Sequence, residues 1–309
     1  SLHDALPIFF MGSTETVLSV LVLVLLGYIL KVLGVLGEED ASTLNRVVIN
    51  VAIPSLIFTS LYRADLSGIS GLVLIPVICM ITGTLSGTIA YLWARRRGLD
   101  SGKTWGLTVA AAMMNSGFLG YPVTAGIFGS EGLVRAIFYD TGTTLMFTSL
   151  GLLLSHLSGG EGSRIMKRAV FFPPLWAFLL GVIFNLWGLP TGIAGTILGY
   201  LSGAAVPLIM ISLGLTLNFR FLRHSVADAT LVSGLRLFIS PVMAAGISYV
   251  LAFRGLNFSV TVLEASMPSA MLAAVLAIEN DLDVDLVSSC IFMSTILSLV
   301  SLPLWSVVL

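Results

Sequence analysis

One short polar stretch, residues 113–122, interrupts an apolar segment that is long enough to cross a lipid bilayer. It reads Met-Met-Asn-Ser-Gly-Phe-Leu-Gly-Tyr-Pro, so Asn115 and Ser116 precede two glycines and a proline. Glycine and proline weaken a helix, and broken backbone is tolerated at membrane depth only where it is buried in protein or lines a cavity. We therefore interpret Asn115, Ser116 and Gly117 as a binding site whose polar groups donate hydrogen bonds to a ligand. Interhelical packing is the alternative role.

A second interruption, Ser266-Met267-Pro268-Ser269, follows at half a chain length, since 268 − 115 = 153 of 309 residues. Each break lies ten or eleven residues into its apolar segment, which is about 15 Å of helix. That distance reaches the middle of a hydrocarbon core about 30 Å thick. Half-helix N-termini meeting there would favour an anion. We expect Met267, Pro268 and Ser269 to complete the site.

The composition is that of a polytopic membrane protein, because charged residues make up only 10% of the chain and mean hydropathy is +1.02. A soluble domain carries about 25% charged residues. The net charge of −1 shows no excess of basic residues of the kind that binds nucleic acid. Cys79 and Cys290 fall in apolar segments, and the three histidines show no ligand spacing. We expect no metal and no cofactor.

Ten segments of about 20 mostly apolar residues can span the membrane. Their approximate limits are 15–35, 44–62, 70–94, 104–128, 133–156, 170–188, 193–216, 228–252, 258–278 and 284–307. We interpret residues 1–10 as a sequence artefact or a disordered tail. The predicted halves are 11–157 and 170–309, joined by a cytoplasmic linker at 158–169.

Lysine and arginine concentrate on one side of this arrangement, as the positive-inside rule requires of cytoplasmic loops. With the N-terminus outside, the outer loops hold three, and the inner loops hold eleven: Lys31, Arg46, Arg95, Arg96, Arg97, Lys103, Arg164, Lys167, Arg168, Arg220 and Arg223. We expect a multi-pass protein of the cell (cytoplasmic, or inner) membrane with both termini outside.

The two halves resemble each other at a nearly constant offset. Pro54 and Pro207 are 153 residues apart, and Thr143 and Ser294 are 151 apart, both within similar short motifs. Because each half has five spans, an odd number, the second half must enter the membrane from the opposite side. Inverted repeats of this kind are a transporter architecture.

At these residues the chain resembles the auxin efflux carrier family, which includes plant PIN transporters and bacterial homologues. The matching motifs are Leu44-Asn45-Arg46 with Ala52-Ile53-Pro54, Asn115-Ser116 with Gly120 and Pro122, Phe128-Gly129, Tyr139-Asp140, Ser212-Leu213-Gly214-Leu215, Met267-Pro268-Ser269 with Ala277, Ser294-Thr295 and Leu302-Pro303. Plant members have proline just before the span 4 asparagine, where this chain has Met114. The break is therefore expected to rest on Gly117, Gly120 and Pro122.

The resemblance implies an all-α fold like that of bile-acid transporters and sodium/proton antiporters, with crossed broken helices in spans 4 and 9. Spans 1, 2, 6 and 7 would form a scaffold, which is a possible homodimer interface. Spans 3–5 and 8–10 would form a moving domain. The implied cargo is a small organic anion, such as an auxin or a dicarboxylate, carried by elevator-type alternating access among membrane lipids.

Further residues inside the spans are weaker candidates. Ser55 and Met210, near the repeated prolines, could wall the site from the scaffold, although packing is the more ordinary role. Asp140, Glu264 and Arg236 are ionisable, and such groups in a membrane usually face a cavity or a partner. They could couple transport to an ion or a proton, or form a structural ion pair.

Three other functions compete with anion transport. An ion-coupled symporter or antiporter would need acids at the crossing itself, which by sequence is neutral. A membrane enzyme would need paired carboxylates, a nucleophile with its base, or metal ligands on the spans, and no such group is present. A sensor that transports nothing would share the fold.

Overall fold

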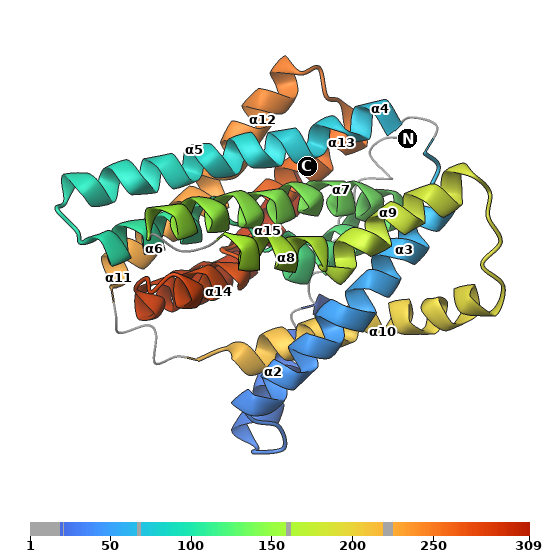
Figure 1. The fold of residues 1–309 in the computed structure, drawn as a ribbon, viewed down its shortest axis with the longest axis horizontal. Helices are drawn as coiled ribbons and strands as arrows, with labels where there is room; N and C mark the ends of the chain where they lie inside the picture. Colours follow the sequence, from blue (N-terminus) through green and yellow to red (C-terminus); the bar gives the residue numbers. More distant parts are fainter. Residues whose placement is uncertain (1–18, 21, 67–68, 159–161, 219–224) are drawn as a thin grey trace. The chain divides into compact units, whose positions relative to one another are not determined.

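The computed structural model describes residues 19–309 except residue 21 and the ranges 67–68, 159–161 and 219–224 (Figure 1). Within the described residues the structure is helical, and one isolated antiparallel bridge joins Met114 to Ser269. The interpretation of residues 1–10 falls outside the described part of the chain.

The chain divides into two compact units that alternate along the sequence. Unit 1 comprises Ser1–Ser70, Gly117–Ile137 and Phe171–Leu217, and unit 2 comprises Gly71–Ser116, Phe138–Val170 and Asn218–Leu309. One helix, α7 (Tyr121–Leu157), contributes to both, and Gly129 interrupts it with φ 66 and ψ −159. A positive φ of this size is accessible to glycine without steric cost. Predicted spans 4 and 5 therefore join through a kinked helix rather than a loop.

Unit 1 is built from helices that pack along their lengths. They are the helix Val22–Val32, α2 (Glu38–Val47), η1 (Val48–Ala52), α3 (Ile53–Arg63), α9 (Pro173–Leu186) and α10 (Gly192–Thr216). Helix α3 packs against α9 and α10. The Asn185 side-chain nitrogen lies 3.0, 2.9 and 2.8 Å from the carbonyl oxygens of Leu61, Tyr62 and Ala64. These contacts give the end of α3 a donor where its last carbonyls have no helical partner.

Unit 2 contains a larger set of helices, besides the later part of α7. They are α4 (Ile69–Leu72, which begins in unit 1), α5 (Leu74–Arg96), α6 (Ser101–Ala112), α8 (Ser163–Val170), α11 (Val226–Gly234), η4 (Leu235–Ile239), α12 (Ser240–Val250), α13 (Gly255–Ala265), α14 (Leu272–Glu279) and α15 (Val284–Val308). Helix α5 packs along α6, and α15 packs against α6, α11 and α14. Figure 1 shows α5 and α6 running together from the turn that joins them.

Helix α6 begins at a side-chain cap. The Asp100 carboxylate accepts a hydrogen bond from the Lys103 backbone N–H at 2.9 Å. That hydrogen bond stabilises the charged form and lowers the pKa of the Asp100 carboxyl from its ordinary value. The cap fixes where α6 starts and hence which residues reach its far end.

Three π-helical turns share one local cause. They are η1, η4 and η2 (Ser116–Gly120), and each precedes a helix that has proline in its first turn, namely Pro54, Pro241 and Pro122. Proline has no N–H to donate to the carbonyl four residues earlier, and its ring crowds that carbonyl. The turn before each proline accordingly departs from the α-helical hydrogen-bond pattern.

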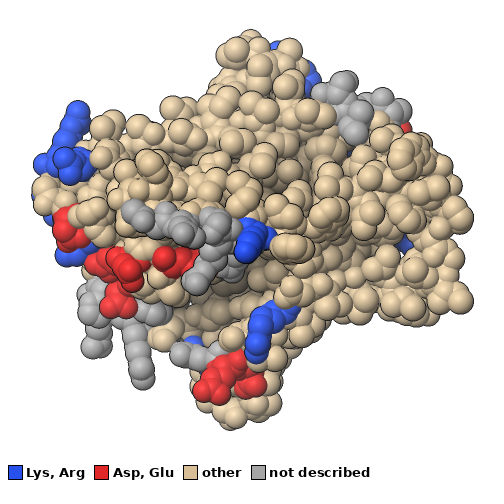
Figure 2. Space-filling view, viewed as in Figure 1, with Lys and Arg blue, Asp and Glu red and all other residues tan. Residues whose placement is uncertain are grey.

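The surface is that of a protein that lies in lipid. Among the described residues, six helical segments are long and apolar enough to cross a membrane, and Val22–Val32 and Pro173–Leu186 are shorter apolar helices. On α5, Val77, Ile81, Leu85 and Ile89 recur every four residues and are each 40–44% exposed. Figure 2 shows wide areas that carry neither basic nor acidic side chains. Contiguous apolar surface of this extent marks a membrane or protein interface.

Within unit 1, Gly214 of α10 lies against the helix Val22–Val32. A Cβ added at Gly214 would overlap the Val24 carbonyl oxygen and the Tyr28 backbone nitrogen, whereas a Cβ at Gly199 of the same helix would meet nothing within 4 Å. We predict that Gly214→Ala lowers stability by about 1–3 kcal/mol through overpacking. Gly199→Ala, the matched control, should raise it by about 0.4–1 kcal/mol. Thermal melts of the two purified variants test this, and equal melting temperatures would contradict it.

Candidate functional site

Two broken helices meet inside unit 2. Helix α6 ends at Ala112, and Met113 has extended backbone with φ −100 and ψ 127. Helix α13 ends at Ala265, and α14 does not begin until Leu272. Both interruptions lie where the sequence places them. We call residues 113–116 and 266–271 the crossover.

Backbone hydrogen bonds join the two strands of the crossover. The Asn115 N–H donates to the Pro268 carbonyl at 2.9 Å, and the Ala270 N–H donates to the Met113 carbonyl at 3.0 Å. These bonds satisfy groups that a helix would otherwise have paired, in a place where each unpaired group costs several kcal/mol. The break in one helix is therefore stabilised by the break in the other.

This pairing corrects one expectation. The break was expected to rest on Gly117, Gly120 and Pro122, but the extended backbone lies before them, at Met113–Asn115. Gly117 and Gly120 belong to the helical turn η2, and Pro122 lies in the first turn of α7. The physical reason is that the pairing with residues 268–270 holds the chain extended without any glycine.

Hydroxyl groups support both strands of the crossover. The Ser116 hydroxyl donates to an Asp140 carboxylate oxygen at 2.5 Å and lies 2.9 Å from the Thr143 hydroxyl. The Ser269 hydroxyl donates to the Ala110 carbonyl at 2.8 Å, and the Ser269 N–H donates to the Ser294 hydroxyl at 3.1 Å.

Thr143 and Ser294 were not predicted as site residues. A usable signal was present, because the two residues lie in similar short motifs at nearly the same offset as the two breaks, with 294 − 143 = 151. Each supports the crossover strand of its own half, Thr143 at Ser116 and Ser294 at Ser269. Hydroxyls that recur at this offset in the sequence are thus candidates for the same role.

The Asn115 side chain is held at the crossover with an unused donor. It is 3% exposed, and among the described residues its Nδ2 has no hydrogen-bond partner. A buried amide without a partner carries a desolvation cost of about 1–3 kcal/mol. Its backbone N–H is already committed to Pro268. The free group is therefore the side-chain NH₂, which can donate two hydrogen bonds.

Ionisable groups also reach the crossover, so the expectation of a neutral crossing is wrong. The Asp140 carboxylate accepts a hydrogen bond from Ser116. The Arg236 guanidinium is fully buried and donates to the Ala265 and Met267 carbonyls at 3.0 and 3.2 Å. Glu264, one residue before the end of α13, is also fully buried. The sequence alone does not show that Asp140 and Arg236 contact the crossover. Both residues lie on helices other than the broken ones, more than 20 residues along the chain from the groups that they contact.

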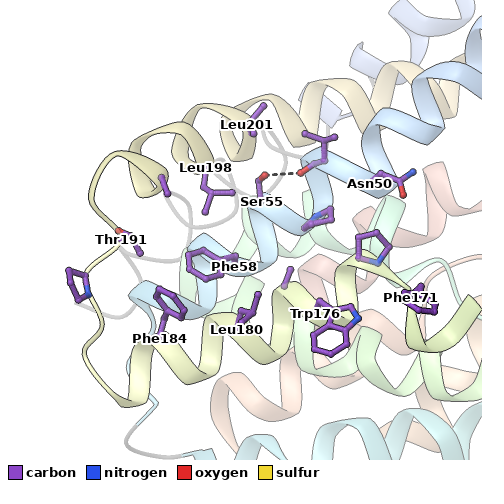
Figure 3. A pocket seen from close by; sticks show the side chains of 16 residues that line it. Asn50, Ser55, Phe58, Phe171, Trp176, Leu180, Phe184, Thr191, Leu198 and Leu201 are labelled. Carbon is purple, nitrogen blue, oxygen red and sulfur yellow. Dashed lines mark hydrogen bonds between the residues drawn. The ribbon is translucent and has the colours of Figure 1, made fainter. Parts of the chain in front are cut away.

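Ser55 and Met210 belong to unit 1, whereas the crossover belongs to unit 2. Ser55 faces a hollow of about 690 Å³ within unit 1, lined mainly by aromatic and aliphatic side chains such as Phe58, Trp176 and Leu198. The Ser55 hydroxyl donates to the Val51 carbonyl at 2.7 Å, and Figure 3 marks the hydrogen bond of Ser55 with a dashed line. Met210 is fully buried and does not line this hollow. The hollow suits hydrocarbon better than a carboxylate, because its lining is mostly apolar and the Ser55 hydroxyl is already partnered.

Within the described residues, no three side chains of the kinds His, Cys, Asp and Glu gather as metal ligands would. The thiol of Cys79 instead packs in the core of unit 2, 3.6 Å from the Met114 sulfur and 3.5 Å from the Thr143 hydroxyl.

The Ser269 hydroxyl provides a direct test of how the crossover is stabilised. We predict that Ser269→Ala lowers stability by about 1–3 kcal/mol, because the Ala110 carbonyl at the end of α6 loses its donor in a buried place. Ser298→Ala is the matched control, since Ser298 is equally buried and donates to the Thr295 carbonyl of its own helix. Thermal unfolding in detergent compares the two. A smaller loss for Ser269→Ala than for Ser298→Ala would contradict the role given to the hydroxyl.

Comparison with known proteins agrees with the resemblance seen in the motifs. The chain is 99% identical over 300 residues to an uncharacterized transporter of Methanothermobacter thermautotrophicus, covering 97% of this chain and 99% of the relative. It is 39% identical over 303 residues to an uncharacterized transporter of Methanocaldococcus jannaschii, covering 96% and 98%. It is 23% identical over 309 residues to the uncharacterized transporter YfdV of Escherichia coli K12, covering 96% of each.

The Membrane transport protein family matches the chain twice, at residues 13–164 and again at residues 161–306. Together the two ranges leave only the ends of the chain unmatched. With the apolar helices of the structure, this match indicates a membrane transporter. The chain is therefore a multi-pass membrane protein that belongs to the Membrane transport protein family, the family of the auxin efflux carriers.

Proposed function

We propose that the protein is a secondary transporter that moves a small organic anion, such as a dicarboxylate, across the cytoplasmic membrane. The observation that carries the proposal is the NH₂ group of Asn115, which is buried without a partner among the described residues where two broken helices meet. A carboxylate oxygen would accept from it. The N-terminal end of α14, which follows the crossover directly, adds partial positive charge that favours an anion.

Contacts between corresponding residues support the proposed inverted repeats. Asn115 and Pro268 are 153 residues apart, and the N–H of one donates to the carbonyl of the other. Ser86 and Ser240 are 154 apart, and their hydroxyls lie 2.7 Å from each other. In a two-fold arrangement a residue meets its own counterpart only at the axis. We infer ten spans in two inverted halves, with this axis passing through the crossover.

The division into units supports elevator-type movement. Unit 2 holds the crossover together with the parts of the chain predicted as spans 3, 8, 9 and 10, and unit 1 holds those predicted as spans 1, 2, 6 and 7. The scaffold and moving domain of an alternating-access carrier would correspond to unit 1 and unit 2. Residues 117–137, from spans 4 and 5, group with unit 1. Transport would then require bending near Ser116 and Ile137.

A second candidate is coupling of the anion to a proton. It is favoured by the Asp140 carboxylate, which accepts the Ser116 hydroxyl hydrogen bond at the crossover. Protonation would remove its charge and weaken that bond, since charge-assisted hydrogen bonds are about twice as strong as neutral ones. Binding of the anion and of the proton would thereby be linked.

Asn115→Ala tests the anion site. We predict that it abolishes the rise in melting temperature produced by carboxylates and reduces uptake into proteoliposomes, while the protein still folds. A panel of mono- and dicarboxylates serves as the probe. Asn280→Ala is the matched control, because the Asn280 amide donates to the Leu276 carbonyl of the preceding helix α14, at the end of that helix away from the crossover. Unchanged carboxylate stabilisation in Asn115→Ala would reject the site.

Asp140→Asn tests proton coupling. If Asp140 carries the proton, an imposed pH gradient should accelerate anion uptake by the natural protein and leave the rate of Asp140→Asn unchanged. Both proteins are measured in the same vesicles, with and without an uncoupler. Equal acceleration of the two would exclude Asp140 as the coupling group and leave the anion site untouched.

A further inference from the structure

Arg236 occupies an unusual place for a charged side chain. It lies in η4 and is fully buried, and its guanidinium donates to the carbonyl oxygens of Ala265 and Met267 at 3.0 and 3.2 Å. A third hydrogen bond, at 3.0 Å, goes to the Ser240 hydroxyl, which in turn lies 2.7 Å from the Ser86 hydroxyl. Burying such a charge is costly unless it is well partnered, so its partners indicate its role.

Those partners are the carboxyl end of a half-helix. Ala265 is the last residue of α13, and Met267 lies in the crossover segment that follows. The last carbonyls of a helix have no intrahelical partners and carry about half a negative charge together. In transporters built from broken helices, half-helix carboxyl ends and unwound carbonyls are where coupling cations bind. The guanidinium lies where such a cation would be coordinated.

In the other half of the chain, a glycine takes the position that corresponds to Arg236. The counterpart of Arg236 is Gly83, and the counterpart of Ala265 is Ala112, since 236 − 83 = 153 and 265 − 112 = 153. Gly83 lies against the end of α6, so that a Cβ added there would be 2.6 Å from the Ala112 carbonyl oxygen. One helix end is thus covered by close backbone packing, while the other is covered by a charge.

We propose that Arg236 is a built-in cation that occupies the place of a coupling cation at the carboxyl end of α13. The protein therefore needs no sodium ion at this end of the crossover, and its positive charge stays when the anion leaves. A guanidinium suits the place because it is held by the chain, is always charged, and presents donors in a rigid fork to two carbonyls at once. This inference adds a cation site to the proposed anion transporter, and it rests on that proposed function.

The test removes the Arg236 side chain and supplies guanidinium ion in solution in its place. Arg236→Ala should lose stability and lower anion uptake by about tenfold or more, because hydrogen bonds from a charged donor are lost from buried carbonyls. Millimolar guanidinium chloride should then raise its melting temperature and restore part of the uptake, as measured against choline chloride at equal concentration. Arg236→Lys should keep part of the natural activity without guanidinium.

Arg254→Ala is the matched control. Arg254 belongs to the same unit, but its guanidinium stacks on the Tyr249 ring and donates to the neighbouring Phe253 carbonyl. Guanidinium should not stabilise this variant. The natural protein should show the same melting temperature and uptake in sodium and in choline.

Two results would overturn the proposal. One is a sodium requirement of the natural protein, which can be measured even if Arg236→Ala does not fold. The other is a folded Arg236→Ala that guanidinium does not stabilise beyond the Arg254→Ala control. The melting temperatures are recorded without any carboxylate, so the cation role is tested independently of the anion site. Failure of carboxylate stabilisation in the natural protein would instead reject the proposed function alone.

Discussion

The structure depends on the mutual satisfaction of two interrupted backbones. Each half of unit 2 gives up helical hydrogen bonds in the middle of an apolar segment, and the two sets of freed groups pair across the crossover, Asn115 with Pro268 and Ala270 with Met113. Neither interruption would be stable alone, because lipid offers no substitute for water. The polar supports around them, from Asp140 to Ser294, follow from the same requirement.

The positions of the breaks could be predicted from residue type, because Asn, Ser and Pro within an apolar segment disfavour an uninterrupted helix. The conformation of the breaks could not. Met113 is extended through its pairing with a segment more than 150 residues away, and no local signal distinguishes it from Met146 or Met210, which are helical. Gly117 and Gly120, the obvious helix breakers, lie in a helical turn.

The charged residues were harder to interpret than the polar ones. Arg236 was recognisable as an ionisable group within a span, but its partners include main-chain carbonyls, which no side-chain pattern encodes. Asp140 was likewise visible in the sequence, while its contact with Ser116 depends on how α7 packs in unit 2. Ser55, a weaker candidate for a wall of the site, faces an apolar hollow because the aromatic lining comes from α9 as well as α3. The spacing of residues in the sequence indicates how deep in the membrane a residue lies along its helix. It does not indicate which other helix packs against the face that carries this residue.

The two cysteines have a practical consequence. Cys79 and Cys290 are both reduced and fully buried in unit 2, and they are the only cysteines of the chain. A thiol without solvent contact reacts slowly with a water-soluble maleimide. A single cysteine introduced on the surface could therefore carry a fluorophore or a spin label without removal of the natural pair. Accessibility from either side of a vesicle could then be mapped residue by residue on an otherwise unaltered chain.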